Sequence, residues 1–528
     1  MFAVLLITRK GNAVSEAVVE QKGMIAFIER VGKRIPDPVI IFIWFFVGAL
    51  LLTGLMGGIT FETSTSGTET TQWQIKNMLA AENVVWLFDN AIVANWLGFG
   101  GGVLGVILIV MLGVGVAENS GLFGAVLKKI SRALPEKLLP LLLVFIGIMS
   151  SIATDAGYLV LIPLAGLLYA GLGKNPLIGM AAAFAGVSAG FSANLIPATP
   201  IDVIIGMNAQ VFAEAQGIPF ENAQGEALTP ATMNYYFILV STFVLAAVGS
   251  WVTLKIVAPR LSQKAFEIPE ELKITDFDVT PAERRGLRAA GIGLVLSLVA
   301  LWGLKVGPLA DYTTAEGQTV KPFINNVIIM ITFVFMVVGI AFGVASGKFR
   351  SMMDVVQAMV KQMDTMGYIL VLTFFCYNFL GLLSYSGLGA YITYLGATGL
   401  VNLGLQSYPV LLLVGFVLVT GLINLFVGGL TSKWMLLGPI FIPMLYMVNA
   451  EMTPDIVAAA FRVADSATNI ITPMMSYAGI ILAFMRKYNP QLTFGEMIAM
   501  MVPYSLAFLV VWVILLVSFF AFGIPLGF

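Results

Sequence analysis

Two related segments, 181–197 and 458–473, place polar residues in the middle of long apolar stretches of the chain. Both begin with Ala-Ala-Ala-Phe, and each ends at a Pro that follows an Asn by a few residues. Of the 528 residues, 59% are hydrophobic and 11% are charged, and the mean hydropathy is +0.94. Such a composition predicts an all-α polytopic membrane protein, because a water-soluble domain of this length carries far more charge.

The two segments belong to a weak internal duplication. The offset between Pro163 and Pro439 is nearly that between Ala181 and Ala458, which argues against coincidence. With a small shift in register, the duplication also pairs Tyr158 with Trp434 and Asn194 with Asn469. The alternative is that Ala- and Phe-rich helices resemble one another without common origin. Duplicated polar breaks in a membrane protein are typical of secondary transporters, whose substrates bind where the broken helices of two repeats meet.

Composition also excludes several function classes. The net charge is −1 and no basic run is present, so nucleic acid is not an expected partner. A single Cys376 excludes a disulfide framework, and the absence of His removes imidazole metal sites and His-based triads. An enzyme would need a nucleophile with its base or a metal cluster, so we expect no enzymatic activity.

Apolar windows of about 20 residues predict nine crossings of the bilayer, and the Lys and Arg bias orients them. The crossings are expected at 38–57, 93–117, 176–209, 236–258, 289–308, 323–346, 363–386, 456–485 and 498–524. Basic residues place the leader, 1–37, in the cytoplasm, so the C-terminus is expected in the periplasm. The expected parts are the leader, a first half at 38–258, a cytoplasmic loop at 259–288 and a second half at 289–528.

Two further apolar blocks, 138–172 and 409–448, are too long for one crossing and are interrupted by polar residues. The first has basic residues on both sides, whereas the second is followed by Glu451 and Asp455. We therefore expect two re-entrant hairpins that enter from opposite faces and give two inverted repeats. Residues 387–408 are expected outside, and an amphipathic helix is expected around Lys128.

Few charged residues fall inside these segments. The acids are Asp155, Asp202 and Asp465, and the comparably placed bases are Arg462 and Lys433. A charge near the bilayer centre costs about 2.5–3.5 kcal/mol on translocon scales, so such residues are functional candidates. The alternative for Arg462 and Asp465 is a structural i, i+3 ion pair within one helix.

Polar residues at the breaks form a second set of candidates. Asn194 and Asn469 lie beside Pro and small residues, where free carbonyls and amide oxygens suit a monovalent cation such as sodium. Alternatively, the two amides satisfy the broken backbone. Thr431, Ser432 and Trp434 at the second hairpin tip combine hydroxyls with an aromatic platform, although Trp434 also suits an interfacial anchor.

The chain resembles the p-aminobenzoyl-glutamate transporter (AbgT) family of the ion transporter superfamily. The resemblance is carried by the segments 181–202, 424–443 and 462–473, in this order. It implies a homodimer in the bacterial inner membrane, with nine spans and two re-entrant hairpins per protomer. It also implies antiport or uptake of p-aminobenzoyl-glutamate or related folate-pathway aromatic acids, with some members exporting p-aminobenzoate and sulfonamide drugs on a proton or sodium gradient.

The resemblance also carries over residue roles. Positions associated with transport in the family match Asp202, Trp434, Arg462, Asp465 and Pro473, and a sodium-binding pair matches Asn424 and Asp465. Three other readings stay open at this point: a dicarboxylate or other anion transporter of the same superfamily, a channel, and an intramembrane enzyme.

Overall fold

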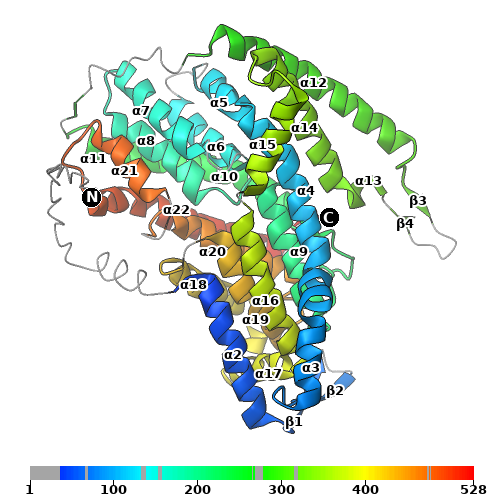
Figure 1. Ribbon diagram of the computed structural model, residues 1–528. Helices are drawn as coiled ribbons and strands as arrows, with labels where there is room; N and C mark the ends of the chain where they lie inside the picture. The colour runs from blue at the N-terminus through cyan, green and yellow to red at the C-terminus, as the bar shows by residue number, and fades with distance from the viewer. Residues whose placement is uncertain are drawn as a thin grey trace, which may run out of the picture.

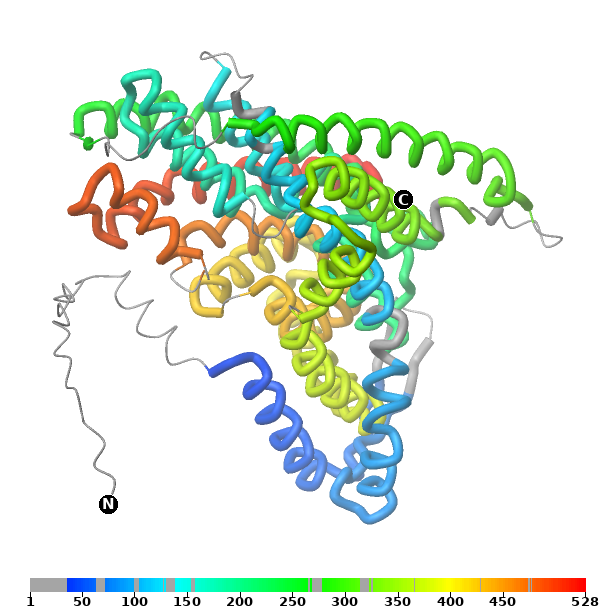
Figure 2. Tube along the Cα trace, turned by 45° about the horizontal axis from the view of Figure 1, so that its top comes forward, coloured from blue at the N-terminus to red at the C-terminus, as the bar shows by residue number. Residues whose placement is uncertain are grey.

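The computed structural model is mostly helical (Figure 1, Figure 2). It describes residues 36–65, 69–132, 138–152, 157–264, 266–267, 278–313, 319–320, 322–364, 366–427, 429–472, 475 and 477–528. The predicted leader, 1–37, therefore lies almost wholly outside the described residues, as do Asp155 and Pro473.

The first half contains the following elements in chain order: α2 (Pro38–Met56), β1 (Thr60–Thr65), β2 (Glu69–Gln74), α3 (Ala81–Asn90), η1 (Ala91–Phe99), α4 (Gly100–Asn119), α5 (Leu122–Arg132), α6 (Leu139–Met149), η3 (Ser150–Ile152), η4 (Gly157–Leu161), α7 (Ile162–Gly171), α8 (Pro176–Phe184), η5 (Ala185–Ala189), α9 (Pro200–Glu214), η6 (Pro230–Thr232), α10 (Tyr235–Val252), η7 (Thr253–Val257) and α11 (Ala258–Leu261). The strands β1 and β2 pair antiparallel, with Phe61 opposite Trp73.

The second half contains α12 (Pro281–Val306), β3 (Tyr312–Thr313), β4 (Thr319–Val320), α13 (Pro322–Asn325), α14 (Val327–Ser346), α15 (Met352–Asp364), α16 (Gly367–Ser386), α17 (Leu388–Asn402), η9 (Leu405–Ser407), α18 (Pro409–Asn424), α19 (Leu430–Val448), α20 (Pro454–Asn469), α21 (Ala478–Arg486) and α22 (Phe494–Ala521). The short strands β3 and β4 also pair antiparallel, beyond the end of α12 (Figure 1).

Local sequence fixes where several helices begin. Thr199, Thr280 and Thr493 each start a capping box, in which the hydroxyl accepts from the backbone of an acid three residues later and that acid accepts from the Thr backbone. Pro occupies the first helical position of α8, α9, α12, α18 and α20, where its missing N–H costs nothing.

The two halves pack in a corresponding way. In the first half, α6 packs against α8, η5 and α10, and α7 packs against α8. In the second half, α18 packs against α20 and α22, and α19 packs against α20. Both arms of each predicted hairpin therefore lie against the broken helix of the same half. The helix α20 also packs against η5 and α9, which joins the two halves.

The core is centred on α20. Every residue from Pro454 to Thr468 is buried, although this stretch contains acids, a base and hydroxyls. Close backbone approach supports the packing in the first half: a side chain at Gly186 would stand 2.2 Å from the carbonyl oxygen of Val144 in α6. A buried helix with polar side chains needs protein partners in place of water.

Segments that the charge bias assigns to one side of the membrane contact one another. On the predicted cytoplasmic side, Lys128 pairs with Glu283 at 2.9 Å, and Lys264 lies 3.7 Å from Glu496. On the predicted outer side, Asn234 donates to the carbonyl of Asp455, Asn449 to that of Gln406, Gln224 to that of Gly523, and the backbone N–H of Lys76 to the carbonyl of Ser386.

Seven helices in the described part of the chain are long and apolar enough to cross a membrane: Pro38–Met56, Pro230–Leu261, Pro281–Val306, Val327–Ser346, Gly367–Ser386, Leu430–Val448 and Phe494–Ala521. Six of them match predicted crossings, and the sixth in chain order is an arm of the second predicted hairpin. The remaining predicted crossings, 93–117, 176–209 and 456–485, are each divided into shorter helical pieces. The count of nine stays a prediction.

Two boundaries differ from those expected. The helix α12 begins at Pro281, inside the predicted loop 259–288, because the capping box at Thr280 starts it before the apolar stretch does. Residues 387–408 contain the helix α17, which packs against α16 and α19. Its Gly and Thr residues weakened the apolar signal that would have indicated a helix there.

Candidate functional site

The polar breaks of the two halves lie together around α20. The first break joins η5 to α9 and contains Asn194, and the second joins α20 to α21 after Asn469. Asn469 donates to the hydroxyl of Ser188 in η5 at 3.0 Å, so the second break touches the first half directly. The structure thus brings together most of the described residues that the sequence singled out.

Asp202 and Arg462 form a buried ion pair that spans the two halves. Each side chain is 3% exposed. Asp202 lies in the first turn of α9, where it also accepts hydrogen bonds from the backbone N–H and hydroxyl of Thr199 at 2.8 and 2.7 Å. The positive end of α9 and the guanidinium of Arg462 therefore both stabilise this carboxylate.

The backbone before α9 carries a local strain. Ala198 has a φ of 53° and is buried, and it is the only non-Gly residue with a positive φ among those that the structure describes. The conformation lets Thr199 cap α9 and so fixes the carboxylate of Asp202. Strain of this kind concentrates at functional sites.

The structure rejects an intrahelical pair between Arg462 and Asp465. Each instead pairs with a residue of another helix: Arg462 with Asp202 of α9, and Asp465 with Lys433 of α19. Removing Arg462 would therefore leave Asp202, and not Asp465, without its charged partner. The i, i+3 spacing put the two side chains near one face of α20, but closer partners on neighbouring helices decided the pairing.

Lys433 is buried in the first turn of α19, with 2% of its side chain exposed. Its ammonium group contacts both the carboxylate of Asp465 and the amide oxygen of Asn424. The amide nitrogen of Asn424 donates to the carbonyl of Asp465 and to the hydroxyl of Thr468, both at 2.7 Å. One cluster therefore joins the end of α18, the start of α19 and the middle of α20.

Together the two pairs form a neutral buried cluster of two acids and two bases. Several buried polar atoms on these residues and on the segments that hold them make no hydrogen bond within the described residues: Nε of Arg462, Oδ2 of Asp465, and the hydroxyls of Ser192 before α9 and of Thr420 in α18. Arg462 is held near Ser192 because its guanidinium donates to the Ser192 carbonyl at 2.9 Å. Buried polar atoms without partners mark positions where a ligand or ion can bind.

Asn194 makes hydrogen bonds of the kind that the structural alternative predicts. Its oxygen accepts from the N–H of Ile196 at 2.9 Å, and its nitrogen donates to the hydroxyl of Ser151 at 2.9 Å. The amide thus satisfies the broken backbone and ties it to the tip of the first hairpin. At the second break, the Thr472 hydroxyl donates to the carbonyl of Leu425 at 3.2 Å and makes the corresponding contact with the second tip.

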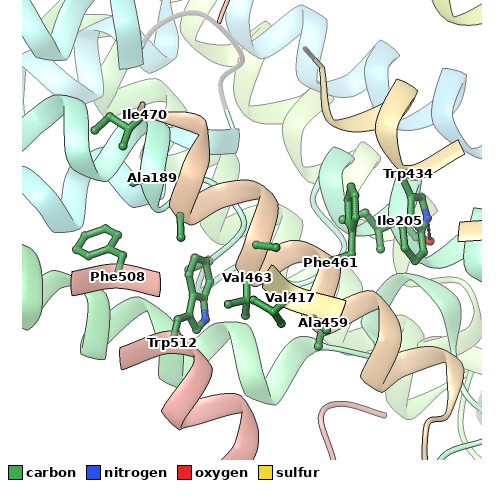
Figure 3. Packing of buried hydrophobic residues seen from close by; sticks show 14 of the residues in the cluster. Ala189, Ile205, Val417, Trp434, Ala459, Phe461, Val463, Ile470, Phe508 and Trp512 are labelled. Atoms are coloured by element: carbon green, nitrogen blue, oxygen red, sulfur yellow. Dashed lines mark hydrogen bonds between the residues drawn. The ribbon is translucent and has the colours of Figure 1, made fainter. Parts of the chain in front are cut away.

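Trp434 is fully buried, which rules out an interfacial anchor. Figure 3 shows its ring beside Phe461, with the indole N–H directed at the carbonyl of Ile205 in α9; the ring centroids are 4.7 Å apart and the hydrogen bond is 2.9 Å long. The ring also packs against Phe212 at 6.0 Å. Tyr158, which the predicted duplication pairs with Trp434, instead stacks on Tyr477 at 4.4 Å.

Thr431 and Ser432 lie in the first turn of α19, after Gly429, whose φ of 77° turns the chain into the helix. Ser432 is buried and Thr431 is partly exposed. Asp155 and Pro473 lie outside the described residues. Sequence reasoning noted Lys433 as a base within a span but gave it no site role, and it did not select Ser192, Thr420 or Thr468. A base nine positions after Asn424, across a hairpin tip, was the available signal for Lys433.

Known proteins resemble this chain over nearly its whole length. A family model described as "AbgT putative transporter family" matches residues 23–528. The chain belongs to the AbgT transporter family. The p-aminobenzoyl-glutamate transport protein of Escherichia coli (strain K12) is 30% identical over 509 residues, which cover 95% of each protein.

Two solved structures are also similar to this AbgT family member. The YdaH transporter of Alcanivorax borkumensis is 35% identical, with a TM-score of 0.83 over 93% of this chain and 100% of that one. MtrF of Neisseria gonorrhoeae, from a class of antimetabolite efflux pumps, is 33% identical, with a TM-score of 0.82 over 93% of this chain and 96% of that one. The predicted family, the helical membrane fold and the transporter class are confirmed, and the chain is not an enzyme.

Proposed function

We propose that this AbgT family member is a secondary active transporter of p-aminobenzoyl-glutamate and related folate-pathway aromatic acids, coupled to a proton or sodium gradient. The observation that carries the proposal is the pair of buried ion bridges that converge on α20 from α9 and α19. Such bridges join elements that must move apart and together in alternating access, since the substrate lies where the repeats meet. Relatives named for p-aminobenzoyl-glutamate transport and antimetabolite efflux support the same class of substrate.

Arg462 and Ser192 suit the acid groups of such a substrate. The Nε of Arg462 and the Ser192 hydroxyl are buried without partners among the described residues, and the two side chains are held near each other. A carboxylate would satisfy both donors and receive charge-assisted hydrogen bonds. Asp202 would then share the guanidinium with the substrate and help to release it.

Trp434 and the first turn of α19 suit the aromatic ring. In the described conformation the indole packs against Phe461 and Phe212. We propose that a shift of the α18–α19 hairpin presents this ring to the substrate, with the hydroxyls of Thr431 and Ser432 beside it. Stacking tolerates ring substituents, so one site would accept p-aminobenzoate and sulfonamide drugs for export as well.

The coupling ion would act at the second ion bridge. Asn424, Asp465 and Asn469 supply carboxylate and amide oxygens, the hard ligands that sodium prefers. When bound, the ion would neutralise the carboxylate of Asp465. These residues would hold it, with the hydroxyl of Thr420 one turn before Asn424 on α18 as a further oxygen.

We also propose a homodimer in the bacterial inner membrane, with a cytoplasmic N-terminus and a periplasmic C-terminus. The Lys and Arg bias supports this orientation. The contacts among segments assigned to each side support the grouping of those segments on shared faces of the membrane. Apolar surface on α12, such as Trp302 at 67% exposed, is available to lipid or to a second copy of the chain.

The test is uptake and efflux of labelled p-aminobenzoyl-glutamate and p-aminobenzoate in proteoliposomes under imposed proton or sodium gradients. Saturable flux with counterflow is expected, and Asp465→Asn should lose its dependence on the gradient. Flux without saturation would indicate a channel. A preference for aliphatic dicarboxylates over aromatic acids would replace the proposal by an anion transporter of the same superfamily.

A further inference from the structure

The ammonium group of Lys433 occupies the oxygen set on which the proposed ion coupling depends. Lys433 is buried, and among the described residues its ammonium group contacts the carboxylate of Asp465 and the amide oxygen of Asn424. A lysine is almost never fully buried unless it is paired. The pairing here uses the same two side chains that the sodium prediction uses.

The orientation of Asn424 is fixed by its other bonds. Both of its amide hydrogens have acceptors, the carbonyl of Asp465 and the hydroxyl of Thr468. A flipped amide would lose these two bonds and would turn an N–H toward the ammonium of Lys433. The oxygen of Asn424 therefore faces the cation, as it would face a sodium ion.

The surrounding atoms suit a small cation. Oδ2 of Asp465 and the hydroxyl of Thr420 are buried without a hydrogen-bond partner among the residues that the structure describes. Thr420 lies one turn before Asn424 on α18, and Asn424 contacts α20 at Asp465. The residues thus fit sodium by chemistry, but the positive charge that the carboxylate can balance is already supplied by the chain.

We propose that the Lys433 ammonium and a sodium ion are alternative occupants of this one site, so that Lys433 acts as a tethered cation that excludes sodium in the described conformation. The carboxylate of Asp465 becomes available to sodium only when the start of α19 withdraws from α18 and α20. The exchange keeps the charge of the site constant, which links the position of the hairpin to ion binding. Lys433 is thus a specificity-determining residue for the coupling ion. The inference rests on the proposed function only in that it calls this ion the coupling ion of transport.

The test measures ion binding without substrate. Purified full-length protein in detergent is titrated with NaCl against choline chloride at constant ionic strength, with the melting temperature and ²²Na binding as the two readouts. Wild-type protein and Lys433→Arg should show little difference between the salts. Lys433→Met, which keeps the length and removes the charge, should bind sodium at least about ten-fold more tightly than wild type, because a competing occupant is gone.

Two control variants locate the effect. Lys128→Met removes a lysine from the ion pair with Glu283, outside the site, and should leave the sodium response of the wild type unchanged. Lys433→Met combined with Asp465→Asn removes the carboxylate as well, and should abolish the sodium response that Lys433→Met gains. A response that survives in the double variant would place sodium elsewhere and overturn the proposal.

Folded Lys433→Met that binds sodium no more tightly than wild type would also overturn it. Should Lys433→Met not yield folded protein, the wild type decides. Mutual exclusion is contradicted if the wild type binds sodium saturably while Lys433 stays protected from amine acetylation. It is supported if acetylation of Lys433 rises with sodium and not with choline. It is also supported if the wild type binds no sodium. None of these outcomes depends on aromatic acid flux, so a failure of the proposed substrate class is scored separately.

Discussion

Replacing Asp202 with Asn tests whether the bridge between α9 and α20 is held by charge. Arg462 is 3% exposed, and the change would leave its guanidinium with the carbonyl of Ser192 but without a counter-charge. Breaking a buried ion pair from one side costs about 3–5 kcal/mol. The Asn oxygen can still accept from the backbone of Thr199, so the capping contribution of about 1 kcal/mol should survive and the loss should report the charge.

The coupling between the two residues follows from a double-mutant cycle. Arg462→Met alone strands the carboxylate of Asp202, but the hydrogen bonds from Thr199 and the N-terminus of α9 still stabilise it, so this loss should fall at the lower end of the same range. The double variant, Asp202→Asn with Arg462→Met, buries no unpaired charge. Its loss should be smaller than the sum of the single losses by at least about 2 kcal/mol.

The assay is equilibrium unfolding of purified protein in mixed detergent micelles, followed by circular dichroism. Lys264 and Glu496 provide a matched control, because their side chains are about half exposed, at 50% and 48%, and Glu496 also caps a helix from the same capping-box position. Lys264→Met and Glu496→Gln should couple by at most about 1 kcal/mol. Losses at Asp202 and Arg462 that add within about 0.5 kcal/mol would refute the reasoning.

Three further predictions concern Trp434, Ala198 and the two expected hairpins. Trp434→Ala should cost about 3–5 kcal/mol of stability because it opens a cavity beside Phe461. Trp434→Phe should lose only about 1 kcal/mol, with the hydrogen bond to Ile205, and should retain much of the affinity for aromatic acids. If binding titrations gave both variants the affinity of the wild type, Trp434 would not belong to the site. Ala198→Gly should be neutral or stabilising in thermal melts, because relief of about 1–2 kcal/mol of strain at φ 53° offsets the entropy cost of Gly. A clear loss of stability would show that the backbone at Ala198 is not strained. On a Cys376-free background, Lys174→Cys should react with an impermeant thiol reagent only from the cytoplasm and Glu451→Cys only from outside, and labelling of both from one side would refute inverted hairpins.

The sequence by itself determined the membrane class and the positions of the polar breaks, and it predicted the duplication. These features depend on composition and on short-range patterns, such as apolar runs of helical length and the polar residues that interrupt them. The local sequence also indicates the helix starts at Pro176 and Pro454, because Pro favours the first helical position and follows Asn175 and Thr453 at the N-cap.

The tertiary structure decided which charges meet. The sequence placed Arg462 and Asp465 near one face of a helix, and that local spacing favoured a pair between them. The actual partners, Asp202 and Lys433, come from α9 and α19, and the first of them is separated from Arg462 by 260 positions. Helical periodicity fixes the face of the helix on which a side chain lies. The packing of the whole bundle decides whether its charged partner comes from the next turn of the same helix or from a neighbouring helix. The same long-range packing buried Trp434 and set the Lys433 ammonium against Asn424, which no local pattern specifies.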